Sequence, residues 1–414
     1  MRKTRKYRSN KKTLRKKITR KRQYKRRKAS KKNVIARKKI IAETINYRIN
    51  ESIKQKMVTV GIMTAPWLSN TDSHITSYMA ASYIKWLESA GALVVPIEFD
   101  LPKPKILGLL RQLNGVVLIG GGIDNSKTHT HEQFLHYQDA VNYVINYSIY
   151  QNGIGNYYPL WCTCMSFELA AIFLTENRIL KHQKSISEKF LEREGQIGPS
   201  VLKWTKKKSK LRNIFTNKEI SEMSKTDSIF QAHSLSITCR SKLSKKLSKV
   251  ANIVAVNTSV PGHGGKGGVK YISIYELKKY PIYGVQFHPE KPPFEYVNDH
   301  KRVPKTDIAI TISNKMARFF INECKKNSNV WIGGKRFFDF TINDYNVYNK
   351  TITNRLKHLH LNKITSNNVG DAGIYLFGPS IIPIEGDILN NPWKTIITND
   401  KNDPLSNSHD PDNP

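Results

Sequence analysis

Cysteine is scarce in this chain: only four of its 414 residues are Cys, at positions 162, 164, 239 and 324. So few thiols cannot form the dense disulfide framework of small secreted proteins. Cys162-Thr-Cys164 has neither the spacing of a zinc knuckle nor that of a CxxC redox pair. Cys239 and Cys324 are expected to be ordinary core or surface residues. The sequence therefore excludes a disulfide-stapled scaffold and predicts no metal site.

Long apolar runs are also absent. No segment reaches the roughly 20 apolar residues that a membrane-spanning helix needs, and the charged start is not followed by the apolar stretch of a signal peptide. We therefore expect no transmembrane segment. We expect an intracellular location, in the cytoplasm or nucleus, or an association with a particle. The hydrophobic content of 39% is sufficient for a sizeable core.

Acidic residues are missing from one part of the chain. Residues 1–40 contain 22 Lys or Arg and no Asp or Glu, whereas the remaining 374 residues carry 46 basic and 32 acidic side chains. A segment of this composition cannot bury a core and is expected to be disordered when free. Its expected partners are polyanions: nucleic acid, an anionic membrane surface, or an import receptor that binds basic signals. The strong positive charge is thus mostly that of an arm attached to an ordinary domain.

From residue 57 onward the hydrophobic pattern alternates between short strands and helices. It predicts, in order, a strand at 57–63, a helix at 78–91, a strand at 93–97, a helix at 103–113, a strand at 116–119, a helix at 131–148, and a strand and helix within 158–174. This alternation is typical of an α/β fold. We expect a three-layer, doubly wound, mostly parallel sheet with helices on both faces.

The later part of the chain is patterned differently. Residues 180–228 are rich in Lys and Ser and are expected to form surface loops or an insertion. Strands are predicted after them at 253–256, 269–274 and 281–287, and a helix at 307–325. The Gly-rich stretch Pro261–Gly268 joins two strands, so it predicts a hairpin loop rather than a phosphate-binding loop. The expected division is 1–56, arm and linker; 57–329, catalytic domain; and 330–414, an extension with a disordered end.

Two segments carry the chemistry. Residues 157–170, YYPLWCTCMSFELA, break an apolar run at Cys164 and resume as a helix, as a strand-to-helix turn that presents a nucleophile does. Residues 280–291, YPIYGVQFHPEK, end a strand in His288-Pro-Glu290. An imidazole can stabilise a thiolate, and a carboxylate can orient that imidazole. Cys164, His288 and Glu290 are the predicted reacting set, although a cysteine taken alone is more often a buried structural thiol.

Four ordered segments resemble gamma-glutamyl hydrolase, a family of the class I glutamine amidotransferase-like superfamily. These segments are Tyr78–Ala92, Asn114–Asp124, Pro159–Glu168 and Tyr283–Lys291. The resemblance extends over roughly residues 57–326 and implies a flavodoxin-like fold with a nucleophile elbow. It also implies a cysteine peptidase that cleaves γ-glutamyl bonds, with folylpoly-γ-glutamates as substrates. Such an enzyme needs neither a metal nor an organic cofactor.

The resemblance assigns roles to single residues. Cys164 would form a γ-glutamyl thioester, His288 would move the protons, and Glu290 would orient His288. The oxyanion donors would be backbone N–H groups of the residues Gly120, Gly121 and Met165. The substrate contacts would be the side chains of Tyr78, Glu168 and His233. For Glu168 the alternative is a helix-surface carboxylate, and Lys291 is expected to be solvated rather than catalytic.

The chain departs from the family near two of these residues. The family has glycine two residues before and two residues after the nucleophile, where this chain has Cys162 and Ser166. Cys162 is therefore a rival thiol, and Cys164 is preferred because it keeps the Trp-x-Thr-Cys spacing. Farther on, Gln231 takes the usual position of a substrate-side histidine and His233 comes two residues later. His233 is thus either a substrate contact or a loop histidine.

Three functions remain open from the sequence. The first is an active hydrolase. The second is an inactive or repurposed member of the family, because the altered turn at Cys164 could prevent thioester formation. The third is a nucleic-acid-binding protein that acts through residues 1–40, with binding that depends steeply on salt. An active enzyme with a targeting or polyanion-binding arm is preferred. The oligomeric state is left open, a homodimer being one option.

Overall fold

A computed structural model of the protein describes residues 57–67, 76–121, 130–176, 190–262, 265–298, 301–331, 342, 347–348 and 374–377. The predicted basic arm and linker at 1–56 and the predicted disordered end of the chain lie outside these described residues. Within them, no helix has both the length and the apolar character needed to cross a membrane.

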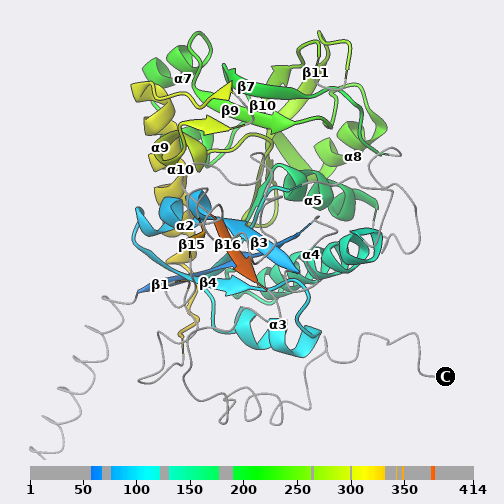
Figure 1. Ribbon diagram of the computed structural model, residues 1–414, viewed down its shortest axis with the longest axis vertical. Coiled ribbons are helices and arrows are strands. Elements are labelled where there is room, and N and C mark those ends of the chain that lie inside the picture. Colours follow the sequence, from blue (N-terminus) through cyan, green and yellow to red (C-terminus); the bar gives the residue numbers. More distant parts are fainter. Residues whose placement is uncertain are drawn as a thin grey trace, which may run out of the picture. The chain divides into compact units, whose positions relative to one another are not determined.

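The core is built on an eight-stranded sheet with the order β4-β1-β5-β6-β12-β11-β10-β8 (Figure 1). The first five of these strands run parallel, and the last three are each antiparallel to the preceding neighbour. Their bounds are β1 Val58–Met63, β4 Ala92–Ile97, β5 Gly115–Leu118, β6 Leu160–Thr163, β8 Lys203–Trp204, β10 Ala251–Thr258, β11 Lys270–Leu277 and β12 Ile282–Val285. The parallel strands are buried and rich in Val, Ile and Leu, because helices cover both of their faces.

Helices form a layer on each face of this sheet. In one layer α5 packs against α4 and α8, and in the other α10 packs against α2 and α9. Their bounds are α2 Ala81–Glu88, α4 Thr130–Gly153, α5 Met165–Glu176, α8 Lys242–Val250, α9 Lys291–Phe294 and α10 Asp307–Cys324. A further helix, α3 (Lys103–Leu110), connects β4 to β5. The predicted three-layer, mostly parallel α/β architecture is confirmed.

Two sequence predictions are wrong. The helix predicted at 78–91 begins only at Ala81, because residues Ser77–Ala80 form strand β3. Of the expectation that residues 180–228 form surface loops or an insertion, the loops are wrong for the described residues 190–228, which contain strands β7 (Gln196–Ser200) and β8 and helix α7 (Asn217–Met223). Their signals are weak in the sequence because β7 contains Gly and Pro and α7 is short. By contrast, the hairpin predicted at 261–268 is confirmed, since β10 and β11 are antiparallel neighbours.

Three smaller sheets complete the fold. β7 pairs with β9 (Ile229–His233), and β13 (Val297–Asn298) pairs with β14 (Lys301–Arg302). The third sheet has the order β15-β16-β3-β2, with β2 at Ala65–Pro66, β15 at Val347–Tyr348 and β16 at Ile374–Phe377. All four residues of β16 are buried, and the Phe377 carbonyl accepts a 2.9 Å hydrogen bond from the Thr76 N–H. The described part of the C-terminal extension therefore belongs to the folded domain.

Glu98, which follows β4, makes stability depend on pH. Burial and the neighbouring Asp100 raise its pKa from 4.5 to about 7, against a smaller lowering by Lys105. Between these two values the folded protein holds a proton that the unfolded chain has lost, so the free energy of unfolding falls as pH rises. One pKa unit corresponds to about 1.4 kcal/mol. We therefore expect Glu98→Gln to stabilise the protein by about 3 kcal/mol at pH 8.

The same substitution is expected to change little near pH 4, where Glu98 is protonated in both states. Denaturant titrations of the wild-type chain and of Glu98→Gln at both pH values check this. Equal stabilisation at the two pH values would contradict the assignment of the effect to ionisation.

Candidate active site

Cys164 occupies the turn between strand β6 and helix α5. Its φ is 53°, and it is the only non-glycine residue with a left-handed φ in the described part of the chain. This conformation costs a residue with a Cβ about 1–3 kcal/mol. The Cys164 N–H donates to the Val285 carbonyl (2.8 Å), and the Cys164 carbonyl accepts from the Glu168 N–H (3.1 Å). The turn is thus held to β12 on one side and to the first turn of α5 on the other.

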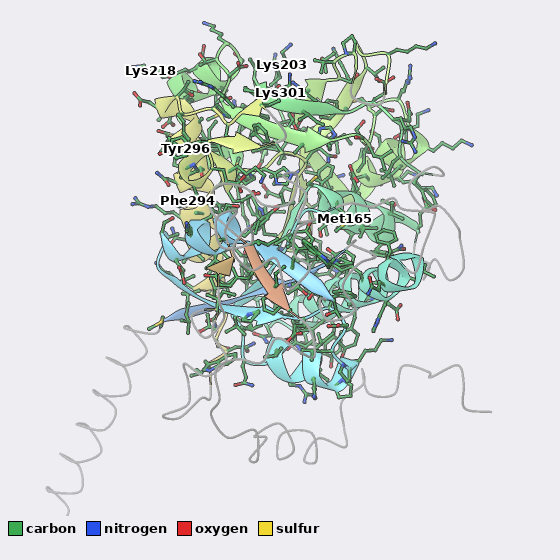
Figure 2. The ribbon with its side chains drawn as sticks, in the orientation of Figure 1. Met165, Lys203, Lys218, Phe294, Tyr296 and Lys301 are labelled. Carbon is green, nitrogen blue, oxygen red and sulfur yellow. The ribbon has the colours of Figure 1, made fainter. Side chains whose placement is uncertain are left out.

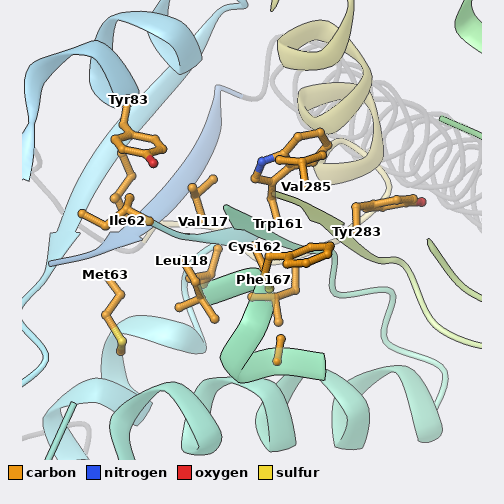
Figure 3. Packing of buried hydrophobic residues seen from close by; sticks show 14 of the residues in the cluster. Ile62, Met63, Tyr83, Val117, Leu118, Trp161, Cys162, Phe167, Tyr283 and Val285 are labelled. Atoms are coloured by element: carbon orange, nitrogen blue, oxygen red, sulfur yellow. The ribbon is translucent and has the colours of Figure 1, made fainter. Parts of the chain in front are cut away.

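The rival thiol lies elsewhere. Cys162 is within β6, fully buried, and belongs to the hydrophobic core. Figure 3 shows its side chain beside Leu118 and Phe167. In the sheet it is paired with Leu118 on one side and Gly284 on the other. Burial raises the pKa of Cys162. Cys162 therefore has the surroundings of a structural thiol.

His288 lies just beyond β12, at the same edge of the sheet as Cys164. Its Nδ1 is 2.7 Å from Glu290 Oε1, and both side chains are buried. A carboxylate only accepts hydrogen bonds, so Nδ1 carries the proton and donates it to Glu290. The basic lone pair is therefore on Nε2. The backbone N–H of His288 donates to the Phe230 carbonyl at 2.9 Å, which anchors the residue to β9.

Gly120, two residues after the end of β5, lies between the Cys164 and His288 side chains. A Cβ built on it would be 2.8 Å from His288 Cε1, 3.1 Å from Cys164 Cβ and 3.2 Å from Tyr83 Oη. Glycine therefore allows three side chains to meet around one backbone atom. The structure brings Cys164 and His288 together, as the sequence predicts.

Tyr83, on α2, is a residue of this site that the sequence did not single out. Its hydroxyl oxygen accepts from the Gly120 N–H at 3.0 Å and lies 3.3 Å from His288 Nδ1. Burial and the nearby Glu290 raise its pKa, so Tyr83 is protonated. The Gly120 N–H is already engaged by this hydroxyl. Among the three predicted oxyanion donors, the N–H groups of Gly121 and Met165 have no backbone partner in the described residues.

Ser166, at a position where the family has glycine, is accommodated by hydrogen bonds. Its hydroxyl donates to the Ile119 carbonyl at 2.6 Å and lies 3.0 Å from the Tyr137 hydroxyl on α4. The Ile119 carbonyl and the Gly120 N–H belong to one peptide group. Ser166 binds one end of that group and Tyr83 binds the other. The extra side chain at the turn therefore fixes the strand end beside Cys164.

Two of the predicted substrate contacts, Glu168 and Tyr78, are buried close to the thiol. Glu168 Oε1 accepts from Gln286 Nε2 at 2.9 Å, and burial raises the pKa of Glu168 well above its ordinary value. It is not the helix-surface carboxylate of the alternative interpretation. Tyr78, on β3, packs edge-on against Trp67, and its pKa is raised by burial and then by Cys164. Both residues therefore lie within electrostatic reach of Cys164.

The third predicted contact, His233, has partners inside the protein. Its Nδ1 is 2.7 Å from the Leu235 carbonyl, its Nε2 is 3.2 Å from Gln231 Oε1, and its ring packs on Tyr271. His233 is the last residue of strand β9 and not a loop residue, and its role as a substrate contact stays a prediction. The strand that carries it still borders the site, because the Ala232 carbonyl is 3.6 Å from Cys164 Sγ.

The position of Lys291 differs from the one expected from the sequence. The sequence analysis placed it in solvent, but it is 6% exposed and forms an ion pair with Glu295 at 2.8 Å. Burial alone would lower its pKa, but Glu295 and Glu290 outweigh that effect and raise it. Lys291 is therefore a buried cation near Glu290 and Cys164. Among the described residues, no three His, Cys, Asp or Glu side chains gather as metal ligands would.

The surroundings of Cys164 raise the pKa of its thiol. Burial raises its pKa, and the carboxylates of Glu168 and Glu290 add to that rise. The Met165 N–H, which faces the sulfur, and Lys291 act in the opposite direction. Figure 2 shows Met165 among the central elements of the fold. On balance these surroundings favour the thiol form of Cys164 over the thiolate.

The class of protein that the fold and the site define is a three-layer α/β protein with a thiol on the turn that follows a central parallel strand. Comparison with known proteins narrows this class. The peptidase C26 family model matches residues 59–290. The chain therefore belongs to the peptidase C26 family, which confirms the predicted resemblance.

Similar proteins are gamma-glutamyl hydrolases. The human protein is 29% identical over 252 residues, which cover 61% of this chain and 72% of that protein. The rat protein is 30% identical over 66% of this chain and 79% of that protein. Gamma-glutamyl hydrolase B of Dictyostelium discoideum is 28% identical over 76% of this chain and 86% of that protein. The matched residues cover more than two thirds of each of these relatives.

Removal of the Tyr83 hydroxyl is expected to slow catalysis. Tyr83→Phe leaves the buried Gly120 N–H without its acceptor. It also removes the hydroxyl that lies 3.3 Å from His288 Nδ1. An unsatisfied buried donor costs about 1–3 kcal/mol, so we expect kcat to fall about tenfold with little change in KM. Tyr158→Phe is the matched control, because that buried hydroxyl binds the Leu110 carbonyl away from the site. Equal kcat values for the two variants would contradict a positioning role for Tyr83.

Proposed function

We propose that the protein is a cysteine hydrolase that cleaves γ-glutamyl bonds. The observation that carries the proposal is the meeting of Cys164, on its strained turn, with the His288–Glu290 pair around Gly120. The turn acts as a nucleophile elbow, because it holds the thiol beyond the end of β6. Membership of the peptidase C26 family supports this chemistry over an unrelated use of the same residues.

The reaction proceeds in two halves. His288 Nε2 takes the thiol proton while Cys164 Sγ bonds to the γ-carboxamide carbon of the substrate. The resulting imidazolium returns that proton to the departing amine, the C–N bond breaks, and a γ-glutamyl thioester remains. Water then attacks the thioester carbon and gives its proton to His288, which passes it to the leaving thiolate. Glu290 holds the imidazole in the required tautomer throughout.

The oxyanion of each tetrahedral intermediate is bound by backbone N–H groups. We assign this role to Gly121 and Met165, since the Gly120 N–H already donates to Tyr83. Met165 is the first residue of α5, so its N–H is one of the unpaired donors at a helix N-terminus. Each such donor contributes about 2.7–4 kcal/mol of transition-state stabilisation in enzymes of this kind.

The glutamyl moiety is recognised beside the thiol. Glu168 is a buried carboxyl group whose hydrogen-bond partner in the described residues is the neutral Gln286 amide. A substrate α-ammonium group would compensate that burial, because an opposite charge favours the carboxylate form. We therefore assign Glu168 to the α-ammonium group and Tyr78 to the wall of the pocket. The folylpoly-γ-glutamate substrate class belongs to this same proposal.

Glutamate release from pteroyl-poly-γ-glutamate by the purified full-length chain tests the function. The expected result is turnover of this substrate with little turnover of free glutamine. Turnover of glutamine alone would make the protein a glutaminase. Failure of a folded, thiol-reduced sample to act on either compound would favour the inactive relative instead.

A second proposal concerns residues 1–40. Their 22 basic and no acidic side chains support binding of a polyanion, beside the enzymatic activity rather than in place of it. Binding of this kind falls steeply with salt and shows little sequence preference. Loss of polyanion binding with retention of hydrolysis, after deletion of residues 1–40, is the expected result.

A further inference from the structure

The small sheet β15-β16-β3-β2 borders the proposed active site. β2 begins two residues after β1 ends, so it leaves the central sheet at the carboxyl edge, where Cys164 and His288 also lie. A Cβ built on Gly121 would lie 3.4 Å from the Ala65 Cβ, which places β2 directly beside one of the assigned oxyanion donors. The small sheet is therefore part of the surroundings of the reacting groups.

Strand β3 connects this small sheet to two residues of the site. Tyr78, in the strand itself, is the proposed substrate contact, and its electrostatic interaction with Cys164 places it near the thiol. Ala80, the last residue of β3, is also the N-cap of α2, so the strand passes directly into the helix that carries Tyr83. The Tyr83 hydroxyl accepts from the Gly120 N–H at 3.0 Å. The position of β3 therefore affects both tyrosines.

Strand β16 is the partner that holds most of β3 (Figure 1). It pairs with all four residues of β3, from Ser77 opposite Phe377 to Ala80 opposite Ile374, whereas β2 pairs only with Ser77 and Tyr78. The four side chains of β16 also belong to the hydrophobic core cluster. Without β16, β3 would be an edge strand with one short partner in the described part of the chain.

Leu376 is the residue of β16 that stands opposite Tyr78. Directly paired residues of antiparallel strands point to the same face of the sheet, with Cβ atoms about 4.5–5.5 Å apart. Phe377 points to the other face, because side chains alternate along a strand. Leu376 and Phe377 are each 1% exposed. The two neighbours therefore differ in the face that they occupy rather than in burial.

We propose that Leu376 is a positioning residue for substrate recognition, which keeps the Tyr78 side chain in place beside Cys164. This inference rests on the proposed hydrolase function, in which Tyr78 contacts the substrate. It concerns a strand outside residues 59–290, the segment that the peptidase C26 model matches. Because Leu376 acts through a substrate contact, its effect should appear as a rise in KM with little change in kcat.

Leu376→Ala in the full-length chain removes the side chain opposite Tyr78 and leaves the backbone pairing of β16 with β3 intact. We expect KM for pteroyl-poly-γ-glutamate to rise about tenfold, while kcat stays within about threefold of the wild-type value. Phe377→Ala is the matched control, because it removes an equally buried side chain from the other face of the same strand. Its KM should stay within about twofold of the wild-type value. Equal KM values for the two variants would overturn the proposal.

A double-mutant cycle tests whether Leu376 acts through Tyr78. Tyr78→Ala removes the proposed substrate contact, so adding Leu376→Ala to it should raise KM no further. If the effects of the two substitutions on KM are instead additive, Leu376 does not act through Tyr78 and the proposal is wrong. Should Leu376→Ala fail to fold, Leu376→Val makes the same comparison with a smaller loss of volume.

Alkylation by iodoacetamide gives a readout that does not depend on turnover. Cys164 is 5% exposed, whereas Cys162 and Cys324 are fully buried, so their rates compare opening of the site with opening of the whole fold. Tandem mass spectrometry of peptides distinguishes the three positions. In Leu376→Ala we expect Cys164 to react about fivefold faster or more, with unchanged rates at Cys162 and Cys324.

The alkylation rates also separate this proposal from the proposed function. Equal acceleration at all three cysteines would show that Leu376 only stabilises the fold, and an unchanged rate at Cys164 would show that it does not position Tyr78; either result overturns the proposal. A wild-type chain without γ-glutamyl turnover would refute the proposed function, and the alkylation rates would still decide whether Leu376 holds Tyr78 beside the thiol.

Discussion

Cys164→Ala is expected to abolish γ-glutamyl hydrolysis, with kcat reduced by about 10⁴-fold or more, because no other described thiol can replace its sulfur at the turn. The substitution removes the atom that bonds to the substrate and leaves His288 and Glu290 in place. It should not destabilise the fold, since alanine also has a Cβ and the strained φ is unchanged. Glutamate release and thermal unfolding, measured on the same preparations, check both parts.

Cys162→Ala is the matched control. It removes a sulfur atom from the core beside Leu118 and Phe167 and is expected to cost about 1 kcal/mol of stability through the cavity it leaves. Its kcat should stay within about threefold of the wild-type value. The opposite pattern, with activity lost in Cys162→Ala and retained in Cys164→Ala, would show that the nucleophile is Cys162 and not Cys164. Full activity in both variants would contradict a mechanism in which either cysteine is the nucleophile.

The sequence can place Cys164 and His288 near each other because each follows a strand that is recognisable in the sequence. Cys164 interrupts an apolar run and His288 follows one, so a parallel sheet necessarily places both at its carboxyl edge. Gly120 follows a third such strand, and the structure indeed brings it between them. The α/β architecture rests on the same alternation of apolar segments, which is a strong signal in long buried strands.

Other parts of the site depend on contacts that no local pattern reveals. Tyr83 is 37 residues from Gly120 and 205 residues from His288, and its helix position looks like any other core position. Lys291 looked exposed because lysine usually is, and only the fold shows that Glu295 holds it in the interior. The pairing of β16 with β3 joins residues about 300 positions apart, and no local pattern in either strand indicates its partner.

Ser166 shows why a departure from a family pattern can be misjudged. From sequence, a side chain in place of glycine predicts strain at the turn. In the structure, that side chain gains the Ile119 carbonyl and the Tyr137 hydroxyl as partners, and these bonds connect α4, α5 and β5. The physical question is therefore whether the added atoms find room and partners, which only the packing of other elements can answer. At Gly120, by contrast, an added Cβ would find no room.

Gly120→Ala is expected to reduce kcat by about 100-fold or more, because a misplacement of roughly 1 Å at a reacting group has effects of this size. The added Cβ would lie 2.8 Å from His288 Cε1 and 3.1 Å from Cys164 Cβ. Neither neighbour can yield cheaply, since Glu290 holds the imidazole and the turn holds the cysteine backbone. The φ of Gly120 is not in the left-handed region, so the effect is steric rather than conformational.

Gly121→Ala separates this effect from a general intolerance of the turn. Its Cβ would meet the Met165 side chain, with Cε at 2.8 Å, and that flexible end can move aside. The Gly121 N–H also remains available to the oxyanion, so kcat should stay within about tenfold of the wild-type value. Steady-state kinetics on both variants, with thermal unfolding as the check on folding, decide the matter. Wild-type kcat in Gly120→Ala would mean that Cys164 and His288 do not need the spacing around Gly120, and the proposed proton transfer between them would have to be abandoned.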